Sequence, residues 1–223
     1  EKRAVFIYYI ELGNNIRGKD ESTMKKTIDN MLDTAKSYGF NMIILQVRSF
    51  SDAIYKSSIY PSSRSVVNTE GEVLPFDILK YFIKVAHQKD LELHAWVNPY
   101  RISNTKDINL ISTSNPAYNM LNSTDVEVMD NGIYYNDYFY PDSSTIDSNE
   151  YNKALEKDRN LSLQKFRLNV ISSLVKKTYN LIKDYDKEIL FGISPDGNIE
   201  NNYNSNYVDT ITFVTKEGYL DYI

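Results

Sequence analysis

His94, Trp96 and Asn98 are three chemically versatile side chains spaced two residues apart at the end of an apolar stretch. Alternate residues of a strand point to the same face of a sheet. The spacing therefore predicts that the three side chains share one face of a strand over 91–97, which Pro99 ends because it has no N–H to donate. A histidine, an amide and an indole on one face are typical of a binding or catalytic wall.

The elements before this stretch place further polar residues near it. Apolar runs over 4–10, 42–47 and 91–97 predict strands, and residues 24–38 and 75–86 repeat apolar side chains at helical spacing. This alternation predicts β–α units and a parallel sheet, whose chemistry lies at the carboxyl ends of the strands. The residues expected at those ends, or in the loops that follow, are Glu11, Gln46, Arg48, Asp52, His94, Trp96, Asn98 and Tyr100.

Composition narrows the classes of function. The chain has 223 residues, 42% of them hydrophobic, which suits one large α/β domain. A net charge of −5 argues against a nucleic-acid partner. Two histidines and no cysteine give no basis for a metal site, and no phosphate-binding loop indicates a nucleotide, so we expect neither metal nor cofactor. No apolar run reaches the ~20 residues that span a bilayer.

The second half of the chain is less regular. Residues 102–131 show no helical period, so no helix is expected there, and residues 142–160 are charged and polar and are expected to form a loop. The expected ordered elements are strands over 132–141, 189–195 and 220–223 and helices over 166–182 and 207–214. About six strands result, whereas a closed (β/α)8 barrel needs eight.

Seven short motifs in a fixed order make the chain resemble the glycoside-hydrolase-like family 10 proteins. They are Arg3-Ala4-Val5 with Tyr9-Ile10-Glu11, Gln46-Val47-Arg48, Ser51–Ser57, His94–Arg101, Asp137–Pro141, Phe191–Pro195 and Glu217–Ile223. The resemblance implies an α/β fold, a single (β/α)8 TIM barrel over 1–223 that is incomplete here. Against the family pattern, roughly thirty residues, one β–α unit, are expected to be absent between Asn136 and Asp137, along with the last strands.

The resemblance also implies a chemistry. Cleaving a glycosidic bond needs a proton for the leaving oxygen and stabilisation of an oxocarbenium-like centre. We predict that Asp137 is the acid/base, with Glu11 as the second candidate, and each carboxylate could instead hold a neighbouring side chain in place. Sugar contacts are predicted for Arg48, His94, Trp96, Asn98, Tyr100, Gln46, Asp52 and Tyr138, against the alternative that they pack the core or shape a loop.

Clostridial cell-wall members of this family look like peptidoglycan-cleaving lytic transglycosylases, and this chain is similar to them. The resemblance implies a peptidoglycan glycan as substrate, a secreted protein at the surface of a Gram-positive cell wall, and attachment to the wall through other domains. Two alternatives stay open at this point. One is a carbohydrate- or wall-binding barrel without turnover, and the other is a glycosidase that acts on another polysaccharide.

Overall fold

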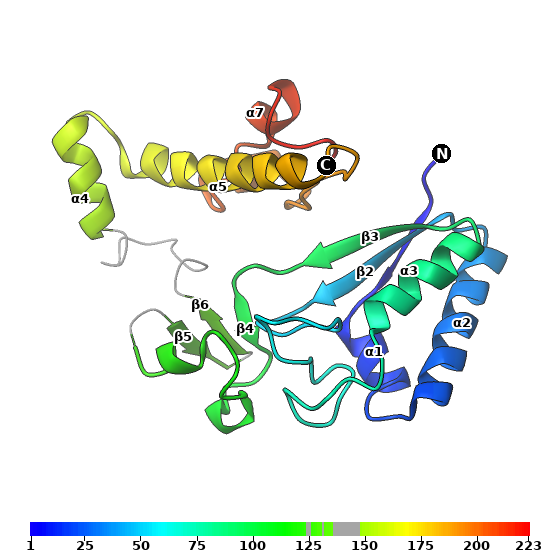
Figure 1. Ribbon diagram of the computed structural model, residues 1–223. Helices are drawn as coiled ribbons and strands as arrows, with labels where there is room; N and C mark the ends of the chain where they lie inside the picture. The colour runs from blue at the N-terminus through cyan, green and yellow to red at the C-terminus, as the bar shows by residue number, and fades with distance from the viewer. Residues whose placement is uncertain (124–125, 131, 136–147) are drawn as a thin grey trace. The chain divides into compact units, whose positions relative to one another are not determined.

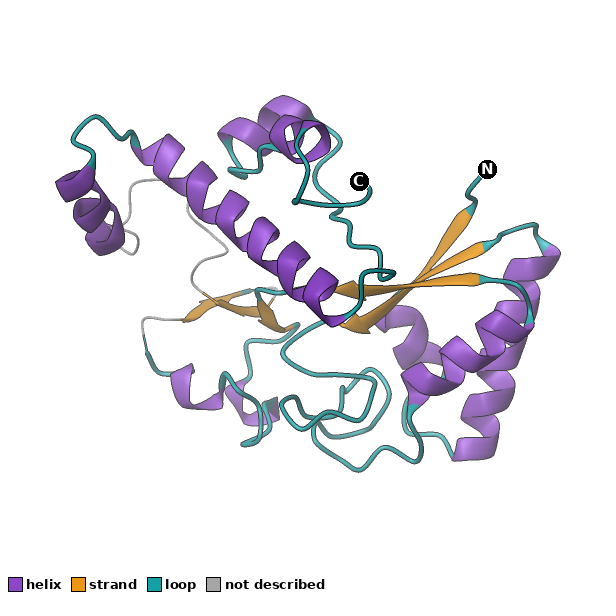
Figure 2. Ribbon diagram, turned by 45° about the horizontal axis from the view of Figure 1, so that its top comes forward, coloured by secondary structure: helices purple, strands orange, loops and turns teal. Residues whose placement is uncertain are grey.

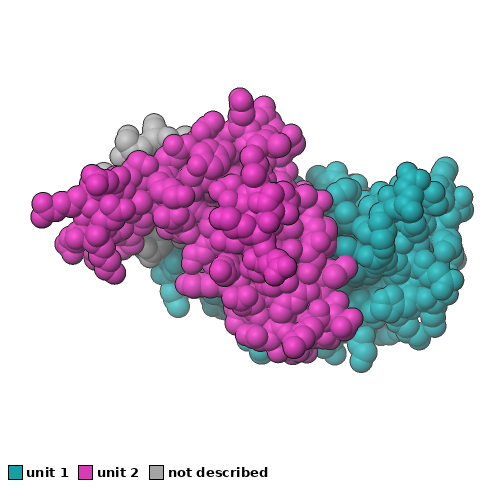
Figure 3. Space-filling view, turned by 90° about the horizontal axis from the view of Figure 1, so that it is seen from above, with its two compact units in different colours: residues 1–139 teal, residues 140–223 magenta. Residues whose placement is uncertain are grey.

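The computed structural model describes residues 1–123, 126–130, 132–135 and 148–223. The chain divides into two compact units, Glu1–Phe139 and Tyr140–Ile223, which Figure 3 shows in two colours. Each unit is described by itself below.

A parallel sheet forms the centre of the first unit. Its strands are β1 (Ala4–Ile7), β2 (Met42–Arg48) and β3 (Glu92–Val97), in the order β1-β2-β3 (Figure 1). The register pairs Ala4 with Met42 and Met42 with Glu92. The parallel sheet predicted from the alternating apolar runs is therefore confirmed.

Two helices cover one face of this sheet: α2 (Glu21–Ser37) and α3 (Ile78–Gln88) lie on the same side of the strands (Figures 1 and 2). Asp20 and Asp77 cap their amino ends by accepting hydrogen bonds from backbone N–H groups three residues on. Gly39 follows α2 with a left-handed φ of +81°, the conformation that lets glycine end a helix. The buried cluster between helices and sheet includes Leu32, Ile43, Leu45, Val47, Ile78 and Phe82.

The opposite face of the sheet has a different character. It carries the alternate residues, among them Phe6, Ile44, His94 and Trp96. Phe6 is 53% exposed, and its ring meets Trp96 edge-on with centroids 5.9 Å apart. Within this unit, no described helix packs on that face, so His94 and Trp96 lie on the face turned away from the helical layer.

The first strand is shorter than predicted. The apolar run over 4–10 gives a strand only as far as Ile7, and a helix, α1 (Tyr9–Asn15), begins within the rest of the predicted strand. Leu12 and Ile16 are fully buried. Helix α1 and its C-cap residue therefore place two apolar side chains in the core.

A small antiparallel sheet follows β3. Its strands β4 (Arg101–Ser103), β6 (Gly132–Tyr135) and β5 (Val126–Met129) lie in the order β4-β6-β5. Two 3₁₀ turns, η1 (Ile108–Leu110) and η2 (Tyr118–Met120), lie between β4 and β5. As expected, the described part of 102–131 holds no α-helix, although it contains β5 and most of β4. Its buried residues Ile102 and Leu121 belong to a cluster that also includes Ile133 of β6.

The second unit is mainly helical. It contains α4 (Ser148–Lys157), α5 (Leu163–Tyr185), α6 (Ile199–Asn204) and α7 (Thr210–Thr215). The long helix over 166–182 and a short one near 207–214 are confirmed in α5 and α7. The predicted loop is wrong for 148–157, which forms α4, and α6 was not foreseen.

The two strands predicted in this unit are also wrong. Residues 189–195 and 220–223 meet only at one isolated parallel bridge, Gly192 with Tyr222. Their apolar composition is that of a strand, but a continuous ladder needs a partner along its length, and the described residues supply one bridge.

The barrel is seen only in part. In the described ranges there is a parallel sheet of three strands and no closed barrel, against the six or so strands expected. The expected gap between Asn136 and Asp137 lies outside the described residues. Of the helices described, none is both long and apolar enough to cross a lipid bilayer.

Candidate active site at the carboxyl end of the parallel sheet

The ends of β2 and β3 bring Arg48 and Asn98 together. The Asn98 backbone N–H donates to the Arg48 carbonyl at 2.9 Å, and the Asn98 side-chain amide donates to the Ser49 carbonyl at 3.3 Å. Pro99 follows and ends the ladder, as predicted. Two residues predicted to contact sugar therefore lie side by side at the edge where parallel sheets carry their chemistry.

Arg48 is held by contacts other than an ion pair. Its Nη2 donates to the Asn98 carbonyl at 3.4 Å, and its guanidinium carbon lies 4.7 Å from the centre of the Tyr60 ring. Among the described residues, Arg48 forms no ion pair. Its guanidinium is thus placed by stacking, with capacity left to donate to an oxygen of a substrate.

Asp52 is a buried carboxyl group in the loop after β2. The residue is 2% exposed, and one carboxylate oxygen accepts from the Phe50 N–H at 3.2 Å. The pKa of Asp52 is raised to about 7, with burial as the largest cause. The nearby Glu70 also contributes to the rise, while the Ser63 hydroxyl, the Phe50 N–H and Arg48 oppose it. A carboxyl group of this kind can hold a proton near neutral pH.

Glu70 is a second buried acid near Asp52. One of its oxygens accepts from the Ser112 N–H at 3.2 Å and from the Asn115 side-chain amide at 2.8 Å. The same amide donates to the Ser51 carbonyl at 2.9 Å. Burial raises the pKa of Glu70 as well, so two carboxyl groups with raised pKa values occur in one loop region.

Both acids line a cavity of about 240 Å³, which we call the acid cavity. Its other lining side chains include Tyr9, Arg17, Phe50 and Arg64. Glu70 and the two arginines were not foreseen as site residues. No sequence signal connects them, because the cavity joins residues 9–17, 50–70 and 102–104, which are distant along the chain.

The raised pKa of Asp52 makes the free energy of unfolding depend on pH. Below about pH 4 the carboxyl group is protonated in both folded and unfolded chains, so no penalty exists. As pH rises, the unfolded chain ionises first, and the free energy of unfolding falls by about 1.4 kcal/mol per pH unit until pH reaches the folded pKa of about 7. We expect a loss on the order of 2 kcal/mol between about pH 5 and pH 7.

Urea unfolding at the two pH values measures this loss. The matched control is Asp52→Asn, which cannot ionise and should lack the contribution, while Glu70 stays unchanged in both proteins. An equal pH dependence in wild type and variant would contradict the raised pKa of Asp52.

Gln46 and Glu11 hold the start of α1. The Gln46 side-chain oxygen accepts from the Tyr9 N–H at 3.1 Å, and a Glu11 carboxylate oxygen accepts from the Tyr8 N–H at 3.4 Å. Gln46 is buried and Glu11 is partly buried. The structure thus gives both side chains a role in positioning α1, and the catalytic role of Glu11 stays a prediction.

The helix-capping role of Glu11 can be measured directly. We expect Glu11→Ala to lower the free energy of unfolding by about 1 kcal/mol, because the Tyr8 N–H loses its partner. Glu11→Gln keeps an acceptor oxygen and should cost less. Equal unfolding midpoints for wild type and both variants would refute the capping role, and the turnover of Glu11→Gln tests the catalytic one.

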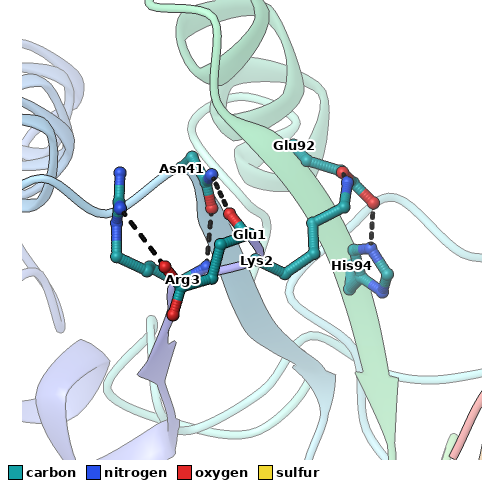
Figure 4. A network of polar contacts seen from close by, with 6 residues as sticks. All are labelled: Glu1, Lys2, Arg3, Asn41, Glu92 and His94. Carbon is teal, nitrogen blue, oxygen red and sulfur yellow. Dashed lines mark hydrogen bonds and ion pairs between the residues drawn. The ribbon is translucent and has the colours of Figure 1, made fainter.

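His94 lies away from the carboxyl end of the sheet. Its Nε2 is 2.6 Å from a Glu92 carboxylate oxygen, and Glu92 also pairs with Lys2, in the network that Figure 4 shows. Burial lowers the pKa of His94, and the positive charge of Lys2 lowers it further. The expected position at the strand end is wrong: register places His94 beside Ile44, in the middle of the sheet.

The remaining predicted site residues are placed as follows. Trp96 packs on Phe6 and pairs in register with Gln46. Tyr100 is partly buried and directly precedes β4. Asp137 and Tyr138 lie outside the described residues. Across the described part of the chain, no group of three or more His, Asp or Glu residues is arranged to hold a metal ion.

Comparison with known proteins identifies the kind of chain. The family model described as "Glycosyl hydrolase-like 10" matches residues 2–131 and 127–223. The glycosyl hydrolase YngK of Bacillus subtilis is 28% identical over an alignment of 256 residues, gaps included, that covers 93% of this chain and 49% of YngK. The glycosyl hydrolase DigH of Escherichia coli K12 is 28% identical over an alignment of 248 residues, gaps included, that covers 86% of this chain and 55% of DigH.

The chain spans about half the length of these curated relatives. The family model matches in two stretches that share residues 127–131. The absence of a β–α unit between Asn136 and Asp137 stays a prediction. With both stretches of the match together spanning nearly the whole sequence, the chain belongs to the glycosyl hydrolase-like 10 family.

Proposed function

We propose that this glycosyl hydrolase-like chain cleaves the glycan strands of bacterial cell-wall peptidoglycan, and that it does so as a lytic transglycosylase. The family supports a glycosidase acting on carbohydrate. The observation that carries the catalytic part of the proposal is Asp52, a carboxyl group with a pKa of about 7 that lies in the loop after β2 and lines the acid cavity.

The chemistry needs one group that gives a proton to the leaving oxygen. Asp52 meets this need at neutral pH, since burial keeps a fraction of it protonated. Asp137, predicted from its motif, is the proposed second carboxylate. Arg48 and Asn98 are proposed to bind hydroxyl or carbonyl oxygens of the same sugar chain.

A lytic transglycosylase can work with a single acid/base. The acid protonates the leaving oxygen, the sugar's own C6 hydroxyl attacks the anomeric carbon, and the same residue then takes the hydroxyl proton. The new C–O bond closes an anhydro ring, and no water is consumed. Cleavage by hydrolysis would instead add one water molecule to the products.

The test is product release from purified peptidoglycan, with neutral storage and structural polysaccharides as parallel substrates. Mass spectrometry distinguishes anhydro ends from hydrolysed ends, which are heavier by one water. Release of anhydro-ended fragments supports the proposal. Hydrolysed ends would contradict the transglycosylase reaction and indicate a hydrolase. Cleavage of another polysaccharide only would contradict peptidoglycan as the substrate.

A binding barrel without turnover is the competing function, and one observation favours it. Asp52 is 2% exposed and already accepts a hydrogen bond from Phe50, as expected of a residue that shapes a loop. Retention on insoluble peptidoglycan without any release would support this interpretation. A site of action outside the cell, at the wall surface, and attachment through other domains are part of the main proposal.

A further inference from the structure

We propose that a second cavity in the first unit is a subsite for one neutral pyranose ring of the glycan. This cavity, which we call the tyrosine cavity, is bounded mainly by residues 55–62 and 71–74 and has a volume of about 390 Å³. Ligand pockets commonly fall between about 300 and 1,000 Å³. The inference rests on the proposed glycosidase function and adds a contact away from Asp52, which does not line this cavity.

The walls of the tyrosine cavity are braced by backbone hydrogen bonds. Ala53 donates to the Pro61 carbonyl at 2.9 Å, and Ser63 donates back to the Ala53 carbonyl at 2.8 Å. Gly71 donates to the Ser62 carbonyl at 3.0 Å and joins the two segments. A ligand would therefore meet a cavity that is already formed, which lowers the cost of ordering on binding.

The lining suits a sugar ring. Tyr55 and Tyr60 offer aromatic rings with polar tips, the side-chain type that packs on the C–H faces of sugars while bonding their hydroxyls. Ile59 and Val73 add apolar surface and are 64% and 92% exposed. The cavity lining also includes one cation and one anion, Lys56 and Glu72. Their opposite charges favour a neutral ring over an acidic one.

Contacts connect this cavity to the end of the parallel sheet. The Arg48 guanidinium lies 4.7 Å from the centre of the Tyr60 ring, and Arg48 also donates to the Asn98 carbonyl. Tyr60 is therefore shared between the cavity and the candidate active site. A glycan chain bound at the sheet edge has a second, preformed place for one of its rings.

Two substitutions at exposed positions test the inference without disturbing the core: Val73→Asp and Ile59→Asp. Each places a solvated carboxylate where the apolar contact should form. We expect KM for long glycan fragments to rise by about tenfold or more, with kcat little changed, because the contact is made equally in the ground and transition states. Disaccharide substrates, which cannot fill both places, should show no difference.

Leu181→Asp is the matched control, since it introduces the same charge at an apolar side chain 71% exposed in α5. Unchanged KM values in Val73→Asp and Ile59→Asp, with all three variants folded, would overturn the subsite.

A binding experiment separates this inference from the proposed function. If wild type releases no product from any glycan, the glycosidase proposal fails, and calorimetric titration with a tetramer of N-acetylglucosamine and with maltotetraose tests the subsite alone. Binding to either oligosaccharide that Val73→Asp weakens and Leu181→Asp does not would support it. Absence of binding to both, or equal binding by both variants, would reject it.

Discussion

Asp52→Asn is expected to lower the rate of glycan cleavage by about 10²- to 10⁴-fold, the range that general acid catalysis contributes. An amide cannot deliver the proton, although it keeps the size of the side chain and an oxygen that can accept from Phe50. The free energy of unfolding of the Asp52→Asn variant should not fall together with its cleavage rate. Above about pH 7 the wild-type chain bears the cost of a buried charge, which the amide of the variant avoids, so the variant should unfold at equal or higher urea concentration.

Glu70→Gln is the control for this result. Its amide oxygen can still accept from the Asn115 side chain, so the loop should keep its connection while a neighbouring charge is removed. We expect less than tenfold loss of rate in this variant. Full activity in Asp52→Asn would show that Asp52 only holds its loop, and Asp137→Asn, assayed in the same series, would then identify the acid that the motif predicts.

Phe82→Ala is expected to have the largest effect on stability, about 3–5 kcal/mol. Phe82 is fully buried in α3 and belongs to the cluster that joins the helices to the sheet. Truncating the ring removes its burial and leaves a cavity that close-packed neighbours fill only in part. Since domains are stable by only about 5–15 kcal/mol, this is a large fraction of the total.

The urea midpoint of unfolding measures this loss. Tyr38→Ala is the control, because Tyr38 is an aromatic residue 78% exposed at the end of α2, and exposed substitutions usually change stability by about 0.5 kcal/mol or less. Similar midpoints for the two variants would show that the core of this unit is not where the structure places it.

The elements predicted well are those whose signal is local. The apolar spacing of α2 and the apolar run of β2 follow from residues within each element. The alternation of these elements was enough to predict a parallel sheet and to place Arg48 and Asn98 at one edge of it. The Asp20 cap, seen in the structure, agrees with the apolar spacing of α2.

The misses come from contacts between distant segments. The start of α1 depends on Gln46 accepting from Tyr9, a contact 37 residues apart in sequence that no local pattern shows. The acid cavity likewise joins Asp52 to Glu70 and to residues 102–104. The run over 189–195 has the composition of a strand, but strand formation depends on a pairing partner, and only Gly192 finds one among the described residues.

The packing of Trp96 on Phe6 has a practical consequence for optical work. The chain has one tryptophan, so all indole fluorescence comes from a single ring on the sheet face opposite the helices. The partly buried ring meets Phe6 of β1 from its place in β3. Its emission therefore reports on the integrity of the parallel sheet, and a change in it would show that β1 and β3 have separated.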